Sequence, residues 1–330
     1  MQSTAIVFVG PQEAVIQSLE MPPPAAGEVQ VRTEFSTISA GTEGWIFRNQ
    51  FTWTPPPFPC VPGYQRVGTI TEVGAGVQGF KIGDRVMAVA GSWEGEIESF
   101  WGSHIALANT PVEHLFLLSP DTPSIDASSA VVAQVGYNAA SRAVLQAGDW
   151  VLVYGDGLIG QCAAQAARAR GLRVMLVGHR AERLSLAAQH SADVAINSHE
   201  EDVGQAVLQH TAGKPVAAVL DSVQAEAAQR EYIELLEPGL GQIVYCGFTP
   251  GTAWADMGLL QQKELTTHFV AGWNRPRMES TLALMAAGRM RIAPLITHLV
   301  PHTHGPEMYR MIIEKSEPFL GITLDWTGEQ

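Results

Sequence analysis

The chain has 330 residues, of which 46% are hydrophobic and 16% are charged, and its formal net charge is −13. This length and composition are typical of a globular protein of two domains with a sizeable core. Because an acidic chain repels phosphate backbones and anionic membrane surfaces, we expect neither nucleic acid nor a membrane as a partner.

The N-terminal residues MQSTAIVFVG lack the basic region and the long apolar stretch of a signal peptide. No apolar run approaches the roughly 20 residues that a membrane-spanning helix needs. Cys60, Cys162 and Cys246 stand alone, without a CxxC motif, so neither a disulfide framework nor a zinc cluster is expected. Together these features predict a cytoplasmic protein.

Residues 1–120 predict a β-rich domain. Short apolar or alternating runs recur there, among them AIVFV, EVQVRTEF and RVGTITEVG, and turn signals such as PPPAAGE separate them. Several short strands at such spacing favour a barrel or a sandwich.

From about residue 124 the pattern becomes helical, and strands then alternate with helices. The expected strands are WVLVYG, RVMLVG, VAIN, AAVLDS and GQIVYCG, with helices at 158–170, 181–190, 201–212 and 225–236. This alternation predicts an α/β fold with a doubly wound parallel sheet.

The C-terminal tail contains a helical stretch around 275–287 and the strands PLITHLV and GITLDW. We expect the tail to return to the first domain, because a lone strand and helix cannot bury themselves. The predicted domains are therefore 1–122 with 272–330, and 123–271.

A glycine-rich turn follows the strand WVLVYG. Gly155, Gly157 and Gly160 form a G-x-G-x-x-G pattern between that strand and an alanine-rich helix. The first glycine permits the tight turn, the second lets the backbone approach a pyrophosphate, and the third lets the helix pack on the strand. This order predicts a dinucleotide site. The predicted cofactor contacts also include Leu158, Ile159, Ser222, Gly247 and Phe248.

The end of the next strand bears on the choice of cofactor. An NAD site has an acidic residue there, which accepts hydrogen bonds from the adenosine ribose. This chain has Gly178, His179 and Arg180, with Arg183 one turn later. A guanidinium can pair with a 2′-phosphate, so NADP(H) is predicted over NAD(H). The alternative is that the two arginines form a solvated helix start.

The chain resembles the medium-chain dehydrogenase/reductase superfamily over essentially its whole length. The resemblance rests on PGYQRVGTITEVGAGVQGFKIGDRV (62–86) and on the GDGLIG turn. It rests also on the order of the parts along the chain, which is a split barrel, a Rossmann domain and a return to the barrel. It is most specific toward the threonine/sorbitol dehydrogenase-like branch. Within that branch, the hydroxyethyl bacteriochlorophyllide dehydrogenases share ISAGTE, PFPCVPGYQRVG, LITHLVP and ITLDW. The resemblance implies a GroES-like β-barrel catalytic domain beside a Rossmann domain, and a homodimer or homotetramer.

The metal ligands that this resemblance would imply are replaced in the chain. Ala40 stands where the first ligand, a cysteine, would be, and Tyr64 with Gln65 replaces the His-Glu pair of the second. The third ligand would fall near Val131, and the stretch AGSWEGEIESFWGSHIAL lacks the four cysteines of a structural zinc lobe. We therefore predict that the chain binds no zinc.

A rival metal cluster consists of His298, His302 and His304. Their spacing can chelate a metal. By the resemblance, however, this stretch is a strand that leads into a cap and a helix.

The resemblance places the 40–43 loop, the 63–65 loop and the nicotinamide around one cleft. Thr42 matches the residue that hydrogen-bonds the substrate oxygen and relays protons to the nicotinamide ribose, so it is also a predicted cofactor contact. Tyr64 offers a hydroxyl as a donor or acid. These two are the predicted catalytic residues, with Glu43 and Gln65 as further candidates or as a structural hydrogen-bonded pair. A catalytic Tyr64 would need its pKa tuned toward neutrality.

Aromatic residues between the two motif loops favour a bulky apolar or aromatic substrate. The predicted substrate contacts are Trp45, Phe51, Trp53 and Trp273, with Trp101, His104 and Asn274 as weaker candidates. Barrel core is an equally good place for some of these aromatics.

The sequence therefore predicts a zinc-independent, NADPH-linked enzyme that interconverts a secondary alcohol and a ketone or aldehyde. A reductase of activated C=C bonds is the first alternative, because zinc is normally absent from the quinone- and enoyl-reductase branches. A non-catalytic NADPH-binding protein is the second.

Overall fold

A computed structural model describes residues 1–247 and 255–328 of the chain. The chain divides into two compact units, which are described separately. The first unit comprises Met1–Val131, Met285–Ala287 and Ile296–Gln330, and the second comprises Val132–Leu284 and Gly288–Leu295. Within the described residues, no helix is both long and apolar enough to cross a membrane.

The C-terminal end of the second unit lies further along the chain than residue 271, where the sequence analysis placed it. Helix α9 (Arg275–Ala286) falls mostly in the second unit. The segment after α9 is tied to the second unit through Arg291, whose N–H donates to the Gln165 side chain and whose carbonyl accepts from it, at 2.6 and 2.9 Å. These bonds explain why residues 288–295 belong to the second unit, and why the rest of the chain belongs to the first unit only from residue 296 onward.

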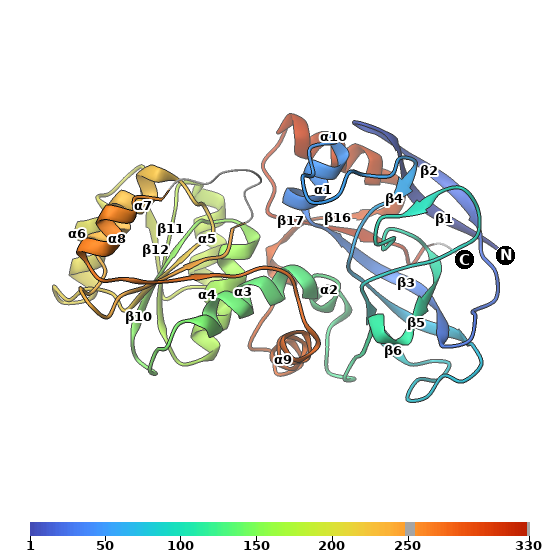
Figure 1. The fold of residues 1–330 in the computed structure, drawn as a ribbon, viewed down its shortest axis with the longest axis horizontal. Coiled ribbons are helices and arrows are strands. Elements are labelled where there is room, and N and C mark those ends of the chain that lie inside the picture. Colours follow the sequence, from blue (N-terminus) through green and yellow to red (C-terminus); the bar gives the residue numbers. More distant parts are fainter. Residues whose placement is uncertain (248–254, 329–330) are drawn as a thin grey trace. The chain divides into compact units, whose positions relative to one another are not determined.

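The first unit is built on two β-sheets. Its strands are β1 (Gln2–Gly10), β2 (Glu13–Glu20), β3 (Glu28–Ile38), β4 (Cys60–Val61), β5 (Arg66–Val73), β6 (Arg85–Ala88), β7 (Glu98–Ser99), β8 (Leu107–Pro111), β9 (Leu115–Leu117), β16 (Ile296–Pro301) and β17 (Gly321–Asp325). One sheet has the order β2-β1-β4-β7, and the other β16-β17-β3-β5-β6-β9, with β8 paired to β3. The tail strand β17 runs antiparallel to β3, so the C-terminal tail completes this sheet (Figure 1).

Short helices complete the first unit. They are α1 (Ala40–Phe47), η1 (Val112–His114), α2 (Ser124–Ala127), η3 (His302–His304) and α10 (Gly305–Glu314). The expectation of a loop at residues 40–43 is wrong, because these residues form the first turn of α1. A carboxylate in that turn, from Glu43, accepts the N–H of Ser39 at 2.8 Å and suits the positive end of the helix dipole.

A buried arginine joins several segments of the first unit. The guanidinium of Arg66 donates to Thr33 and Thr110 Oγ1, at 3.1 and 2.7 Å, and to two backbone carbonyls. Burial lowers the pKa of Arg66 to about 9, which still leaves the side chain charged at neutral pH. Neutral acceptors on β3, on β8 and in the loop after β6 therefore solvate this cation.

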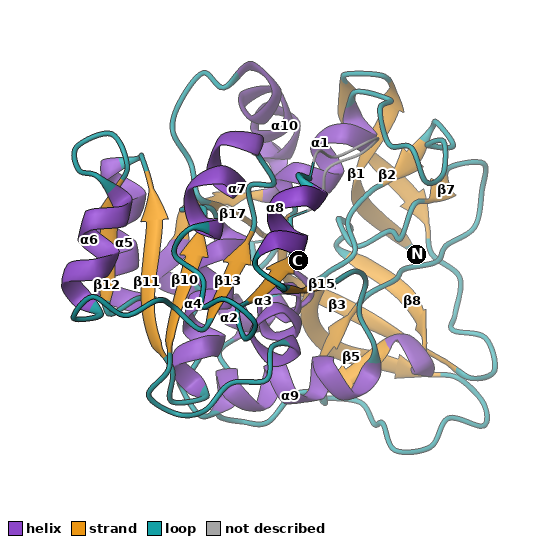
Figure 2. Ribbon diagram, turned by 60° about the vertical axis from the view of Figure 1, so that its left-hand side comes forward, coloured by secondary structure: helices purple, strands orange, loops and turns teal. Residues whose placement is uncertain are grey.

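The second unit is a parallel sheet with the order β12-β11-β10-β13-β14-β15. Its strands are β10 (Trp150–Tyr154), β11 (Arg173–Gly178), β12 (Val194–Asn197), β13 (Ala218–Asp221), β14 (Gln242–Tyr245) and β15 (Thr266–Phe269). Its helices are α3 (Ala130–Arg142), whose first two residues lie in the first unit, α4 (Leu158–Ala169), α5 (Ala181–His190), α6 (Val203–His210), α7 (Glu226–Ile233) and α8 (Met257–Gln262), with α9 and the short η2 (Ala293–Leu295). Helices flank the strands, as Figure 2 shows. The predicted doubly wound parallel sheet is confirmed.

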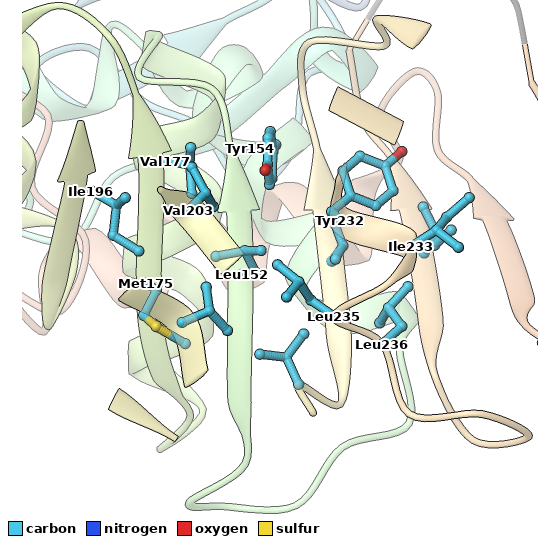
Figure 3. Packing of buried hydrophobic residues seen from close by; sticks show 14 of the residues in the cluster. Leu152, Tyr154, Met175, Val177, Ile196, Val203, Tyr232, Ile233, Leu235 and Leu236 are labelled. Atoms are coloured by element: carbon cyan, nitrogen blue, oxygen red, sulfur yellow. The ribbon is translucent and has the colours of Figure 1, made fainter. Parts of the chain in front are cut away.

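Burial explains why the strands of this sheet are almost wholly apolar. Leu152, Met175 and Val219 are completely buried in one cluster with side chains of α6 and α7. Figure 3 shows Leu152 and Met175 among the side chains of this cluster. Strands of a parallel sheet that is covered on both faces need apolar residues at consecutive positions rather than at alternate ones. Helix α8 and strand β15 are additions that the sequence analysis did not foresee.

Candidate functional site

The turn after β10 requires glycine at two positions. Gly155 has φ +116°, and a Cβ there would lie 2.2 Å from Ser222 Oγ. A Cβ on Gly160 would lie 2.0 Å from the carbonyl oxygen of Gly155, so only glycine lets α4 start this close to the strand. Gly157 is the N-cap residue of α4, and no atom lies within 4 Å of where its Cβ would be. Backbone N–H groups at a helix start with open space above them suit a pyrophosphate.

Asp156, between the first two glycines, reaches the end of β11. Its Oδ2 accepts the backbone N–H groups of His179 and Arg180 at 3.1 and 3.0 Å, and its Oδ1 accepts from the guanidinium groups of Arg180 and Arg183 at 3.0 and 3.4 Å. A Cβ on Gly178 would lie 2.5 Å from the Cβ of Asp156. Glycine at position 178 therefore makes room for a carboxylate that comes from the turn.

The charge on Asp156 is well compensated. Burial raises its pKa, but the N–H groups of Arg180 and His179 and the charges of Arg180 and Arg183 outweigh burial and lower it below its ordinary value. A carboxylate offers about four acceptor positions, and here four donors use them. Asp156 thus pairs with both arginines, and about half of the Arg180 side chain stays exposed to solvent.

The other predicted cofactor residues lie as follows. Leu158 and Ile159 are partly exposed in the first turn of α4, and the His179 ring stacks on His199 at 4.9 Å between ring centroids. The Ser222 hydroxyl donates to the Tyr154 carbonyl at 2.8 Å, and a Cβ on Gly247 would lie 2.7 Å from the Ser222 carbonyl oxygen. Phe248 lies outside the described residues.

In the first unit, three hydroxyl groups converge near the start of α1. The side chains of Ser39 and Thr42 lie near enough to the Tyr64 hydroxyl to lower its pKa through hydrogen bonding. Ser39 is the N-cap residue of α1 but makes no side-chain cap, which leaves its hydroxyl available to Tyr64. The two predicted catalytic residues are thus together, and Ser39 is an addition that the sequence reasoning missed.

The pKa of Tyr64 is raised rather than tuned toward neutrality. Burial raises it most and the nearby charge of Glu43 raises it further, while the bonds to Ser39 and Thr42 oppose the shift. Tyr64 therefore remains protonated at physiological pH, and its hydroxyl can donate a hydrogen bond.

A buried hydrogen-bonded chain lies behind these hydroxyls. Glu43 Oε2 accepts from Tyr309 Oη at 2.5 Å and contacts His104 Nε2 at 2.8 Å, and His104 Nδ1 lies 2.8 Å from Ser36 Oγ. Trp326 Nε1, which can only donate, bonds Ser36 Oγ at 2.9 Å. The Ser36 hydroxyl then donates to His104, whose Nε2–H donates to Glu43, so this tautomer satisfies every bond.

Glu43 and Gln65 are not a hydrogen-bonded pair with each other. The Gln65 amide donates to the Thr37 carbonyl at 3.2 Å, and its oxygen accepts the N–H of Val131 at 3.1 Å. Both side chains are completely buried. Gln65 therefore joins β3 to the start of α3, whereas Glu43 bonds to His104 and Tyr309.

The side chains at the expected metal positions do not fit zinc. Ala40 and Val131 have no donor atom, the Gln65 amide is bonded to backbone, and Tyr64 stays protonated. Zinc takes deprotonated thiolate, imidazole or carboxylate ligands in a tetrahedral set. In residues 1–247 and 255–328, no three His, Cys, Asp or Glu side chains are grouped so that they could hold a metal.

Two histidines of the rival cluster, His298 and His302, have other partners. His298 contacts Thr297 and Glu317, and His302 stacks on Trp326 with 4.4 Å between ring centroids. Neither arrangement brings these side chains together as a ligand set.

An aromatic cluster in the first unit contacts Tyr64 through Trp101. Trp101 contacts the Tyr64, Phe51 and Phe100 rings, and Phe51 contacts Trp53, which is 64% exposed. Phe51 is therefore largely core, while Trp53 and Trp101 reach the surface. Trp45 is partly buried in α1, and Trp273 belongs to the second unit.

The parallel sheet with a glycine turn at the start of α4 is the arrangement that suits a dinucleotide cofactor. Residues 25–102 match the alcohol dehydrogenase GroES-like domain, and residues 159–287 match the zinc-binding dehydrogenase family. The chain belongs to the medium-chain dehydrogenase/reductase superfamily and is an oxidoreductase of the alcohol dehydrogenase type.

Individual relatives agree with this family. The chain is 28% identical to 2-desacetyl-2-hydroxyethyl bacteriochlorophyllide A dehydrogenase of Cereibacter sphaeroides, over 99% of each chain. The fold is similar to that of an alcohol dehydrogenase from E. coli CFT073 in complex with NADH (TM-score 0.83, 21% identity, 98% and 99% of the chains covered). It is also similar to a Sinorhizobium meliloti 1021 protein described as a zinc-binding dehydrogenase, bound to NADP (TM-score 0.84, 18% identity, 98% and 99% covered).

Proposed function

We propose that the protein is a zinc-independent, NADP(H)-linked oxidoreductase that interconverts a secondary alcohol and a ketone or aldehyde on a bulky apolar or aromatic substrate. The observation that carries this proposal is the meeting of the Ser39, Thr42 and Tyr64 hydroxyls. They meet at the place where zinc-dependent relatives have metal ligands, and the chain offers no zinc donor set there.

The hydroxyls take over the handling of the substrate oxygen. Bound NADPH supplies the hydride that a carbonyl carbon receives. Negative charge then develops on the carbonyl oxygen, and preorganised donors stabilise such charge. The Tyr64 hydroxyl donates to this oxygen and passes it a proton, Thr42 hydrogen-bonds the same oxygen, and the proton on Tyr64 is replaced from water.

Preference for NADP(H) is supported by the Asp156 arrangement. An NAD site needs a carboxylate that accepts bonds from the ribose hydroxyls. The acceptor positions of Asp156 are already used by protein donors, and Arg180 keeps an exposed cationic group beside them. A 2′-phosphate fits this environment better than a bare ribose does.

The proposed partners are a small-molecule substrate and a second copy of the chain in a dimer or tetramer, in the cytoplasm. Support for self-association comes from β15, an edge strand of the parallel sheet whose Phe269 is 74% exposed. Edge strands with exposed apolar side chains are suited to pairing with another chain.

A substrate panel tests the proposed reaction. Purified protein is given NADPH with matched aryl and alkyl ketones, aldehydes, enones and quinones, and cofactor oxidation is followed at 340 nm. Reduction of ketones supports the proposal. Turnover of enones or quinones alone would instead identify a C=C reductase, and tight NADPH binding without turnover would identify a binding protein.

A further inference from the structure

Trp101 has a backbone conformation that bulky side chains avoid. Its φ is +67°, in the left-handed region, and the next residue, Gly102, has φ +71°. Glycine or asparagine takes this conformation at little cost, but a large aromatic side chain there is strained. Strained backbone concentrates at functional sites, where the side chain is needed in that place.

The loop around Trp101 is fastened on both sides. The Trp101 carbonyl accepts the N–H of Gly91 at 2.8 Å, and the N–H of Phe100 bonds the Val61 carbonyl at 3.0 Å. The N–H of Ser103 bonds the Gly63 carbonyl at 2.9 Å. The loop therefore runs along the segment that leads into Tyr64, and its backbone fixes the indole.

The indole lies directly beside the proposed proton donor. The Trp101 and Tyr64 ring centroids are 5.2 Å apart with perpendicular planes, and Phe100 supports the indole at 4.7 Å. Phe51 and Phe100 are buried, whereas Trp101 is 37% exposed. Within this cluster, Trp101 therefore presents aromatic surface next to Tyr64 that a ligand can contact.

We infer that Trp101 is a specificity-determining residue that selects substrates with an aryl group on the carbonyl carbon. This inference rests on the proposed ketone reduction. When Tyr64 donates to a carbonyl oxygen, a substituent on the carbonyl carbon lies close to the ring neighbours of Tyr64. A planar aryl group gains an offset or edge-to-face contact with the indole, and a saturated ring of similar size does not. One such aromatic pair changes relative rates by roughly 2- to 12-fold.

The test compares two matched substrates, acetophenone and cyclohexyl methyl ketone, with NADPH. The measured quantity is the ratio of kcat/KM for the aryl ketone to kcat/KM for the saturated one. This ratio is independent of the fraction of active enzyme, so partial misfolding of a variant does not disturb it. The variants are Trp101→Ala, Trp101→Phe, and Trp150→Phe as an aromatic control in the second unit, each also titrated with NADPH.

We expect the native enzyme to favour the aryl ketone by about fivefold or more. Trp101→Ala should bring the ratio to within about twofold of unity with unchanged NADPH binding, while Trp101→Phe and Trp150→Phe keep the native ratio. A Trp101→Ala ratio equal to the native one, or a native enzyme without aryl preference, overturns the role of Trp101 and leaves ketone reduction standing. If neither ketone is reduced, the proposed function fails and this inference fails with it.

Discussion

His104 Nε2 lies 2.8 Å from Glu43 Oε2, and neither side chain is exposed to solvent. Gly63, the residue before Tyr64, packs directly against the His104 imidazole. Its φ is +91°, and a Cβ there would lie 2.6 Å from the ring. His104 therefore packs against the backbone next to Tyr64. Through Ser36 and Tyr309, the Glu43–His104 pair also connects β3, α1 and α10.

The first prediction concerns this buried carboxylate. Glu43→Gln replaces one acceptor oxygen by an NH₂ group, which then faces a donor from Ser39, His104 or Tyr309. We expect the free energy of unfolding to fall by about 2 kcal/mol, because a buried donor loses its partner. Glu72→Gln, at an exposed position on β5, is the control and should stay within about 0.5 kcal/mol. Chemical denaturation measures both, and equal midpoints would show that the Glu43 network contributes no stability.

The second prediction concerns the two proposed oxygen-handling hydroxyls. Removal of one well-placed donor typically costs on the order of 100-fold in rate. We therefore expect Thr42→Val and Tyr64→Phe each to lower kcat for ketone reduction about 100-fold, with NADPH binding by Tyr64→Phe unchanged. Steady-state kinetics and a fluorescence titration measure these quantities. Should both variants turn over within threefold of the native enzyme, the proposed donor pair is wrong.

The third prediction is a pH dependence that differs between the two reaction directions. Burial and the charge of Glu43 raise the pKa of Tyr64 above its ordinary value of 10.0. The hydroxyl therefore stays protonated at every pH up to that value. Ketone reduction should therefore not decline through ionisation of Tyr64 between about pH 6 and pH 10. In alcohol oxidation the proton of the alcohol passes to the ionised (phenolate) form of Tyr64, whose fraction grows with pH, so this rate should rise with pH. A fall in reduction with a midpoint near pH 7 that disappears in Tyr64→Phe would contradict this sign.

The fourth prediction concerns cofactor choice. Arg180→Gln removes the half-exposed guanidinium beside Asp156, and a charge-assisted bond to a 2′-phosphate is worth about 1.5–3 kcal/mol. NADPH affinity should fall roughly tenfold or more, while NADH affinity changes less than about twofold. Arg168→Gln, near the opposite end of α4 and paired with Asp193, is the matched control. Tighter binding of NADH than of NADPH by the native protein would refute the preference.

The parallel sheet and its glycine turn could be predicted because their signals are local. Gly155, Gly157 and Gly160 lie within six consecutive residues, and apolar strands alternate with helices at regular spacing. The expected helix at 181–190 has the bounds of α5, and the strand VAIN those of β12.

The hydrogen-bond partners of Glu43 could not be predicted from the sequence, because they are distant from Glu43 along the chain. Tyr309 is 266 residues from Glu43, and His104 is 61 residues away. Asp156 occupies an x position of the G-x-G-x-x-G pattern, to which the pattern assigns no role, yet its carboxylate bonds Arg180 24 residues later.

The most direct test of the central claim is NADPH-dependent ketone reduction measured together with the metal content of the same sample. The account predicts the same kcat before and after dialysis against a strong chelator, with zinc far below one equivalent per chain. Loss of activity on chelation that added zinc restores would contradict it.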